Sequence, residues 1–183
     1  MKYMIASDIH GSAKYAQETL RIFEAEQADY LLLLGDLLYH GPRNPLPEAY
    51  DPQQVSELLN SVKEKIIAVR GNCDSEVDQM LLEFPMMHDT NVVPLPTQKL
   101  VLSHGHIYHD QSLPKNLAAN DIFMFGHIHL PVLKQENNIH IFNPGSISIP
   151  KEGHPNTYGI LEENQLFIKT LDGEIYRQGE LSS

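Results

Sequence analysis

Short apolar runs alternate with amphipathic segments in the first half of the chain. The recurrence of apolar residues predicts a helix beginning after Ser12, with Ala16 and Phe23 on one face. A second helix is predicted over residues 53–64, and a short one from Ser75. The apolar runs between them predict buried strands at residues 3–7, 31–34 and 66–69. Alternation of strand and helix is typical of parallel strands joined by crossovers.

The second half of the chain is richer in predicted strands than in predicted helices. The pair Asn137-Asn138 lies between two apolar runs and predicts a hairpin turn, and Asp172-Gly173 predicts another turn. The strands are predicted at residues 99–103, 122–126, 131–135, 139–143, 157–161, 166–171 and 175–177. The two halves together predict an α/β fold with two sheets and helices outside.

The composition is that of a globular protein with an excess of acidic residues. The 183 residues are 42% hydrophobic and 20% charged, and the formal net charge is −11. Lysines and arginines are scattered, so we expect no extended nucleic-acid surface. The longest aliphatic run, residues 31–34, is far too short to span a membrane. The single cysteine, Cys73, cannot form an internal disulfide, which favours a cytoplasmic protein. From the length of the chain we expect one domain over residues 1–183.

Several predicted strands end at polar residues that are able to bind a metal ion. Asp8 and His10 follow the first strand, Asp36 the second and Asn72 the third, and histidines follow two later strands. Ligands gather beyond the carboxyl ends of strands in open α/β sheets, so we expect these side chains to converge. The complete set of expected ligands is Asp8, His10, Asp36, Asn72, His104, His127 and His129.

This set of side chains offers oxygen and imidazole ligands without thiolate. Such ligands suit Mn, Fe, Co, Ni or Zn and disfavour a structural cysteine-rich zinc site. The set is too large for one ion and sufficient for two when one carboxylate bridges them. Two ions about 3.5–4 Å apart can activate water and stabilise both the attacking and the leaving oxygen at phosphorus. Such a centre suits hydrolysis of a phosphate ester, and the acidic composition makes a small ester rather than a long nucleic acid the expected substrate.

Five short motifs contain the expected ligands. They are Asp8-Ile9-His10, Gly35-Asp36, Gly71-Asn72-Cys73-Asp74, Ser103-His104-Gly105-His106 and Gly126-His127-Ile128-His129. In this order they resemble the motifs of the calcineurin-like metallophosphoesterase family. Residues 40–44, 71–78 and 143–146 are also similar to the small YfcE-type phosphodiesterases of that family.

The resemblance implies a four-layer α/β/β/α sandwich, with two packed mixed sheets and outer helices on both faces. It implies in-line attack on a small phosphodiester by a hydroxide that bridges two divalent ions, with manganese as the expected metal. Self-association into a homo-oligomer is also implied, without a stoichiometry. The first metal would take Asp8, His10, Asp36 and His129, and the second Asp36, Asn72, His104 and His127.

Cys73 stands where many relatives have a histidine that acts on the leaving group. A thiol is a weak hydrogen-bond donor with an ordinary pKa of about 8.5, whereas a positioned general acid contributes about 10²–10⁴-fold in rate. We therefore predict a preference for diesters or activated esters over alkyl monoesters, with His106 or His109 as a replacement. Arg43 is expected either to bind a substrate phosphate through its guanidinium fork or to be a solvated loop residue. The residues expected to act on the substrate are Asn72, Cys73, His106 and Arg43.

Two nearby segments have expected supporting roles. Asp74 is expected to cap the helix that begins at Ser75 or to orient a metal ligand, rather than to bind metal itself. Residues 143–146 are expected to form a tight turn at the rim of the site.

Two other functions stay open on the sequence alone. A phosphomonoesterase or nucleotidase would use the same ligands. A non-catalytic metal-binding scaffold, such as the retromer subunit with this fold, is disfavoured by the full ligand set. Turnover of diester and monoester distinguishes the three.

Overall fold

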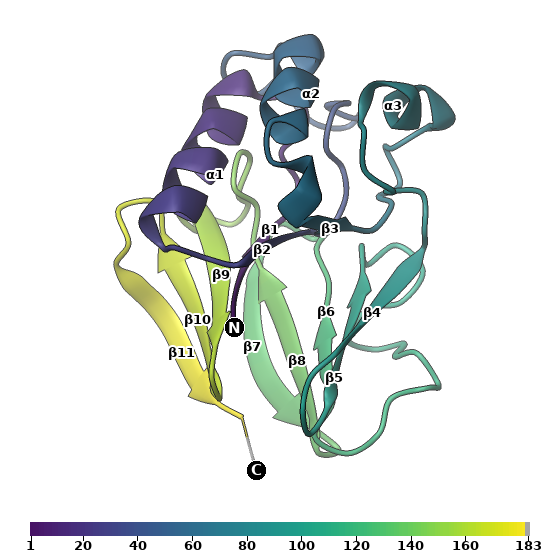
Figure 1. Cartoon of the computed structure of the whole chain (residues 1–183), viewed down its shortest axis with the longest axis vertical. Coiled ribbons are helices and arrows are strands. Elements are labelled where there is room, and N and C mark those ends of the chain that lie inside the picture. Colours follow the sequence, from purple (N-terminus) through teal and green to yellow (C-terminus); the bar gives the residue numbers. More distant parts are fainter. Residues whose placement is uncertain (182–183) are drawn as a thin grey trace.

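Two mixed β-sheets pack face to face in the computed structural model of the protein, which describes residues 1–181 (Figure 1). Within each sheet, three neighbouring strands run parallel and the remaining pairings are antiparallel. The six-stranded sheet has the order β11 (Ile175–Glu180), β10 (Gln165–Thr170), β9 (Thr157–Glu162), β1 (Lys2–Ala6), β2 (Tyr30–Leu33) and β3 (Ile66–Ala68). The five-stranded sheet has the order β4 (Thr90–Pro94), β5 (Lys99–Ser103), β6 (Ile122–Met124), β8 (Ile139–Pro144) and β7 (Pro131–Glu136).

The helices begin where the sequence predicts them. α1 (Ala13–Ala25) is capped by the Ser12 hydroxyl, which accepts the Tyr15 amide hydrogen at 3.3 Å. α2 (Pro52–Asn60) ends four residues before the predicted 53–64 boundary, and a 3₁₀ turn (Lys63–Lys65) follows. The Ser61 hydroxyl donates to the Leu58 carbonyl at 2.6 Å and so competes with continued helical bonding. α3 (Glu76–Leu81) is short and buries none of its residues.

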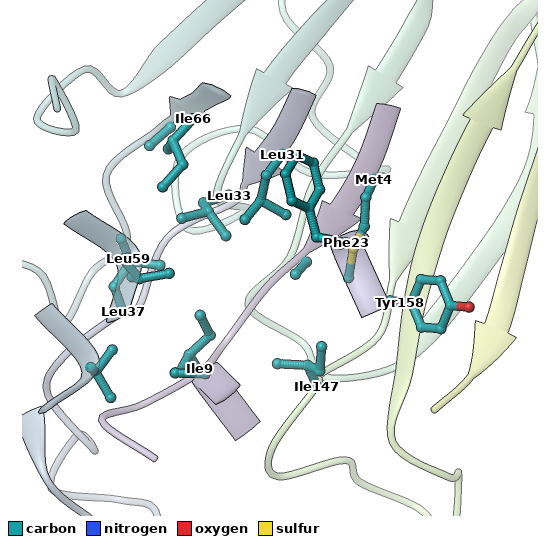
Figure 2. Close-up of a cluster of buried hydrophobic side chains, with 14 of the residues drawn as sticks. Met4, Ile9, Phe23, Leu31, Leu33, Leu37, Leu59, Ile66, Ile147 and Tyr158 are labelled. Atoms are coloured by element: carbon teal, nitrogen blue, oxygen red, sulfur yellow. The ribbon is translucent and has the colours of Figure 1, made fainter. Parts of the chain in front are cut away.

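α1 and α2 cover the outer face of the six-stranded sheet. Alternate residues of β1 serve the two faces of that sheet: Met4 packs under the helices, whereas Ile5 packs against the five-stranded sheet. Phe23 of α1 and Leu59 of α2 belong to the same buried cluster as Met4 (Figure 2). The sheets therefore share one apolar layer, and the helices close a second.

The outer face of the five-stranded sheet is covered by residues 105–120, which carry no helix. Leu113 and Leu117 of this segment pack against Val101 and Phe123 of the sheet. The α/β sandwich of two mixed sheets is confirmed, and its outer helices lie on the six-stranded sheet. The fourth layer is a loop, because this stretch lacks an apolar periodicity of 3.6 residues and Pro114 interrupts it. Within residues 1–181, no helix combines the length and apolar character needed to cross a membrane.

Candidate metal centre

The carboxyl ends of the parallel strands meet at one edge of the sandwich and carry the expected ligands there. β1 leads to Asp8 and His10, β2 to Asp36 and β3 to Asn72. β5 leads to His104, and β6 to His127 and His129. The structure brings these side chains together in two clusters, which a third group of possible ligands, His10, Asp36 and Cys73, joins. The first is Asp8, His10 and His129, and the second is Asp36, His104 and His127 with Asn72 beside them.

The first cluster is fully buried and has its polar atoms turned inward. Asp8 Oδ1 lies 3.5 Å from His10 Nε2 and 3.3 Å from His129 Nε2. The two imidazole Nε2 atoms are 3.3 Å apart. One carboxylate oxygen and two ring nitrogens therefore converge on one point, as ligands of a single ion do.

Asp36 connects the first cluster to the second. Its Oδ2 atom lies 3.6 Å from His10 Nε2 and 3.4 Å from His104 Nε2. Asn72 Oδ1 lies 3.1 Å from His104 Nε2. Asp36 thus occupies the position that a bridging carboxylate would need.

The far sides of three imidazole rings are fixed by backbone carbonyls. Nδ1 contacts the carbonyl of Tyr39 in His10 (2.9 Å), of Leu34 in His104 (2.7 Å) and of Ile149 in His129 (2.7 Å). A carbonyl oxygen can only accept, so each Nδ1 carries a hydrogen and donates it. Each Nε2 is then left facing the centre for a proton or a cation, the arrangement that orients histidine ligands in metalloproteins.

Several of these residues have strained backbone conformations. Positive φ values are uncommon outside glycine and concentrate at functional sites. The residues with positive φ in the two clusters are Asp8 (59°), His10 (52°), Asp36 (55°), His127 (67°) and His129 (61°). Aspartate and histidine adopt this region more often than most other residues do, but five such angles in two clusters still require support from the surrounding structure.

Two serines of the segment after β8 support Asp8. The Ser146 and Ser148 hydroxyls donate to the Asp8 carbonyl at 3.0 and 2.7 Å. Ser146 Oγ also accepts the amide hydrogen of Ile149 at 2.9 Å, and the Ile149 carbonyl accepts from His129. The expected turn at residues 143–146 therefore lies at the site and links two members of the first cluster.

Asp74 orients the backbone around Asp36. Its carboxylate accepts the amide hydrogens of Asp36 (2.8 Å), Leu37 (2.9 Å) and Gly71 (2.7 Å). Burial, with the charge of Asp36, raises the pKa of Asp74 to about 6. The capping of α3 falls instead to Ser75 and Asp78. Of the two roles expected for Asp74, the structure thus shows the orienting one.

The donor set fits a divalent cation. Asp8 Oδ1 is buried and has no hydrogen-bond partner within the described residues, although Oδ2 of the same carboxylate accepts from Ser7 and His127. A buried carboxylate oxygen without a partner is expensive unless a cation or proton reaches it. The buried carboxylates of Asp8 and Asp36 also repel one another, and a bound cation would offset this repulsion.

The pKa values indicate which groups of the centre hold a proton that a cation would have to displace. Burial opposes ionisation of Asp8 and Asp36, but the histidine Nε2 atoms that lie 3.3–3.6 Å from their carboxylate oxygens lower both carboxyl pKa values below the ordinary range. Burial lowers the pKa of His104, yet its bond with Asp36 dominates and raises that pKa to about 9. Burial and the neighbouring His104 lower the pKa of His127 to about 4. A proton and a cation therefore compete for His104 Nε2, and cation binding should weaken as the pH falls.

A cavity of about 440 Å³ opens over the centre. Asn72, Cys73 and Arg43 line it as expected, and Asn44 and Lys151 line it in addition. Lys151 was missed in the sequence because no motif includes it, although it lies five residues after the segment 143–146 that was expected near the site.

The remaining candidates lie beside the cavity or away from it. The His106 ring centroid is 5.5 Å from that of His104, and its buried Nδ1 has no hydrogen-bond partner within residues 1–181. His109 instead contacts Asp110 and the Gln111 amide. Burial and the Asp36 carboxylate raise the pKa of Cys73 to about 12, so its thiol stays protonated. His106 is therefore the better placed of the two histidines expected to replace the family histidine.

Two mixed sheets with carboxylate, amide and imidazole groups at the ends of their parallel strands define a metallophosphoesterase. The sequence model of the calcineurin-like phosphoesterase superfamily domain matches residues 1–165, and the chain belongs to this family. The fold and the resemblance noted from the motifs are thus confirmed.

Individual relatives extend this finding. Phosphodiesterase YfcE of Escherichia coli (strain K12) is 51% identical over 174 residues, covering 95% of this chain and 94% of that protein. The solved structure of YfcE, a phosphoesterase from E. coli, matches with a TM-score of 0.97 at 50% identity, covering 100% of both chains. Vacuolar Protein Sorting 29 from Cryptosporidium parvum matches at a TM-score of 0.66 and 19% identity, covering 100% of this chain and 98% of that one, which shows the fold alone. Family and relatives together support a hydrolytic enzyme acting on phosphoesters.

Proposed function

We propose that the protein is a phosphodiesterase that hydrolyses a small phosphodiester with two divalent metal ions. The observation that carries the proposal is the position of Asp36 between the two clusters, 3.6 Å from His10 Nε2 and 3.4 Å from His104 Nε2. The 51% identity to phosphodiesterase YfcE over nearly the whole chain favours diesters as the substrate class.

Each side chain of the centre has a proposed part in holding the ions. Asp8, His10, Asp36 and His129 would hold one, and Asp36, Asn72, His104 and His127 the other. When bound, such ions supply a water-derived nucleophile at neutral pH and stabilise negative charge at phosphorus. Manganese is our choice of metal, on the family resemblance, and Zn, Fe, Co and Ni are the alternatives that this ligand set admits.

The protein's own residues would bind and orient the ester. Arg43 lines the cavity and is exposed, so its guanidinium fork is free to bind a phosphate group of the substrate. Cys73 stays protonated, and a neutral thiol is a weak donor to a leaving group. The proposed substrates are therefore diesters or activated esters, and it is the activated leaving groups that need little help from a proton. A cavity of about 440 Å³ suits a small molecule rather than a long polymer.

The test compares two esters on protein stripped of metal and reloaded with Mn²⁺. We expect bis(p-nitrophenyl) phosphate to be hydrolysed faster than p-nitrophenyl phosphate, and only with metal. Asp36→Asn and His127→Ala should abolish turnover, whereas His88→Ala, at an exposed histidine outside the cavity, should retain it. Dominant monoester turnover would change the assignment to phosphomonoesterase.

Metal binding without turnover is the outcome that a scaffold predicts. A Vps29 from Entamoeba histolytica that shares the fold at 18% identity has been solved as a complex with Zn²⁺. Turnover, rather than metal binding alone, is therefore the measurement that separates an enzyme from a scaffold. A cytoplasmic location and self-association stay predictions from the sequence and the family resemblance.

A further inference from the structure

Free positive charge is scarce in this protein, and its distribution is uneven. The chain has 24 acidic residues against 13 lysines and arginines. Most of these cations already have an acidic partner. The paired ones are Lys2, Lys14, Lys63, Lys99, Lys134, Lys169, Arg21 and Arg70.

Two further cations lie over aromatic rings. Lys65 lies 5.7 Å from the Phe23 ring centroid, and Arg177 lies 5.8 Å from that of Tyr176. Within residues 1–181, this leaves Arg43, Lys115 and Lys151 with neither an ion pair nor a ring. Two of these three line the cavity over the candidate metal centre, and Lys115 does not.

The two cavity cations come from separate loops with fixed backbones. Arg43 follows β2 in a turn that is closed by the Asn44 amide, which donates to the Gly41 carbonyl at 3.2 Å, while the Asn44 side chain donates to the His40 carbonyl at 2.9 Å. The Lys151 amide donates to the His129 carbonyl at 3.4 Å, and its own carbonyl accepts from the His154 amide at 3.1 Å. Both side chains are exposed and remain free to meet a ligand.

The reacting phosphate does not account for both of them. A phosphodiester carries a single negative charge. Two divalent ions and the two carboxylates of the centre together carry a net positive charge that is already larger than this. Free cations at a cavity mouth in an acidic protein raise the local concentration of anionic ligands. An arginine fork together with a lysine point charge suits a phosphate in particular.

We propose that Arg43 and Lys151 form a second anion site, so that the preferred substrate is a phosphodiester carrying an additional phosphate. This inference rests on the proposed function, since it names the substrate class of the same cavity. The second phosphate binds at the rim while the diester lies over the metal centre.

A matched pair of esters tests the second anion site. Thymidine 5′-(p-nitrophenyl phosphate) and its 3′-phosphorylated form share leaving group, sugar and base. We expect kcat/KM to be about tenfold higher for the 3′-phosphorylated ester, which corresponds to two exposed ion pairs that each lie within the usual range of strength. The ratio of the two kcat/KM values should approach one in the double variant Arg43→Gln/Lys151→Gln. In Lys151→Gln alone, this ratio should be about threefold lower than in the wild type. Lys115→Gln should keep the wild-type ratio.

A binding arm separates this inference from the proposed function. The Mn²⁺-loaded protein is titrated with thymidine 3′,5′-bisphosphate and with thymidine 5′-monophosphate. Tighter binding of the bisphosphate that is lost in the double variant supports the second site, even if neither ester is hydrolysed and the proposed function fails. A ratio near one in the wild type, or one that is unchanged in the double variant, overturns the inference while leaving phosphodiesterase activity intact.

Discussion

Ser146 is the most informative position for a single substitution outside the clusters. Its hydroxyl donates to the Asp8 carbonyl and accepts the amide hydrogens of Ser148 (3.3 Å) and Ile149 (2.9 Å). Ser146→Ala therefore removes three hydrogen bonds, and two of the groups left behind are amide donors. Ser148→Ala is the matched control, because its hydroxyl donates to the same Asp8 carbonyl.

The magnitudes follow from burial. An unpaired buried amide costs about 1–3 kcal/mol, and the Ile149 amide belongs to a residue that is only partly buried, so we expect Ser146→Ala to lower the free energy of unfolding by about 2–4 kcal/mol. Ser148→Ala loses one hydrogen bond, and the Asp8 carbonyl that accepted it still accepts from Ser146. We therefore expect the free energy of unfolding to fall by about 1 kcal/mol. Because Ser146 supports both Asp8 and the carbonyl that orients His129, Mn²⁺ affinity should fall by about 10–100-fold.

Two measurements separate stability from metal affinity. Urea unfolding of the metal-free proteins gives the first, and calorimetric titration of the folded variants with Mn²⁺ gives the second. Equal stability losses in Ser146→Ala and Ser148→Ala would refute the reasoning from unpaired amides. Unchanged Mn²⁺ affinity in Ser146→Ala would refute the claim that this turn orients the first cluster.

Three further outcomes are expected. Cys73→Ser should retain diester turnover within about threefold, because a thiol with its pKa near 12 is no nucleophile at neutral pH; loss of turnover with metal still bound would show a covalent role. Gly71→Ala should lower stability by about 1–3 kcal/mol and weaken Mn²⁺ binding, because the new methyl group would overlap the Asp36 carboxylate. Thermal unfolding and titration with Mn²⁺ check this, and wild-type values in both measurements would contradict it. Burial opposes ionisation of Glu26, but hydrogen bonds led by that from Lys169 lower its pKa from 4.5 to about 2, so its contribution is present above pH 4.5 and is lost as the pH falls towards 2. Glu26→Gln should then unfold about 1–2 kcal/mol more easily at pH 7, with the difference from wild type shrinking at pH 3; a constant difference in denaturant midpoints would contradict the linkage.

Strands with a clear apolar pattern were predictable from the sequence. The strand predicted at 99–103 is β5 (Lys99–Ser103), and the Asn137-Asn138 turn has the two positive φ values that such a hairpin turn needs. β4 was missed, because Val93 is the sole buried residue of Thr90–Pro94 and no alternation marks this edge strand.

The convergence of the predicted ligands was also predictable, because strand ends determine which residues share an edge. The conformations that aim those side chains were not. The backbone of Asp8, which has a positive φ, is held by hydrogen bonds from Ser146 and Ser148, and both serines are distant from it in the chain. The position of Lys151 in the cavity likewise depends on how a loop folds back to His129. Tertiary contacts of this kind leave no periodic signal in the sequence.

The most direct test of the two-metal assignment is to count manganese ions while measuring turnover. Metal-free protein is titrated with Mn²⁺, and bound metal per chain is compared with the rate of bis(p-nitrophenyl) phosphate hydrolysis. The account predicts that turnover rises to its maximum as a second equivalent binds, and that Asp36→Asn neither binds two ions nor hydrolyses the diester. Full turnover with one bound equivalent, or two bound ions without any turnover, would contradict it.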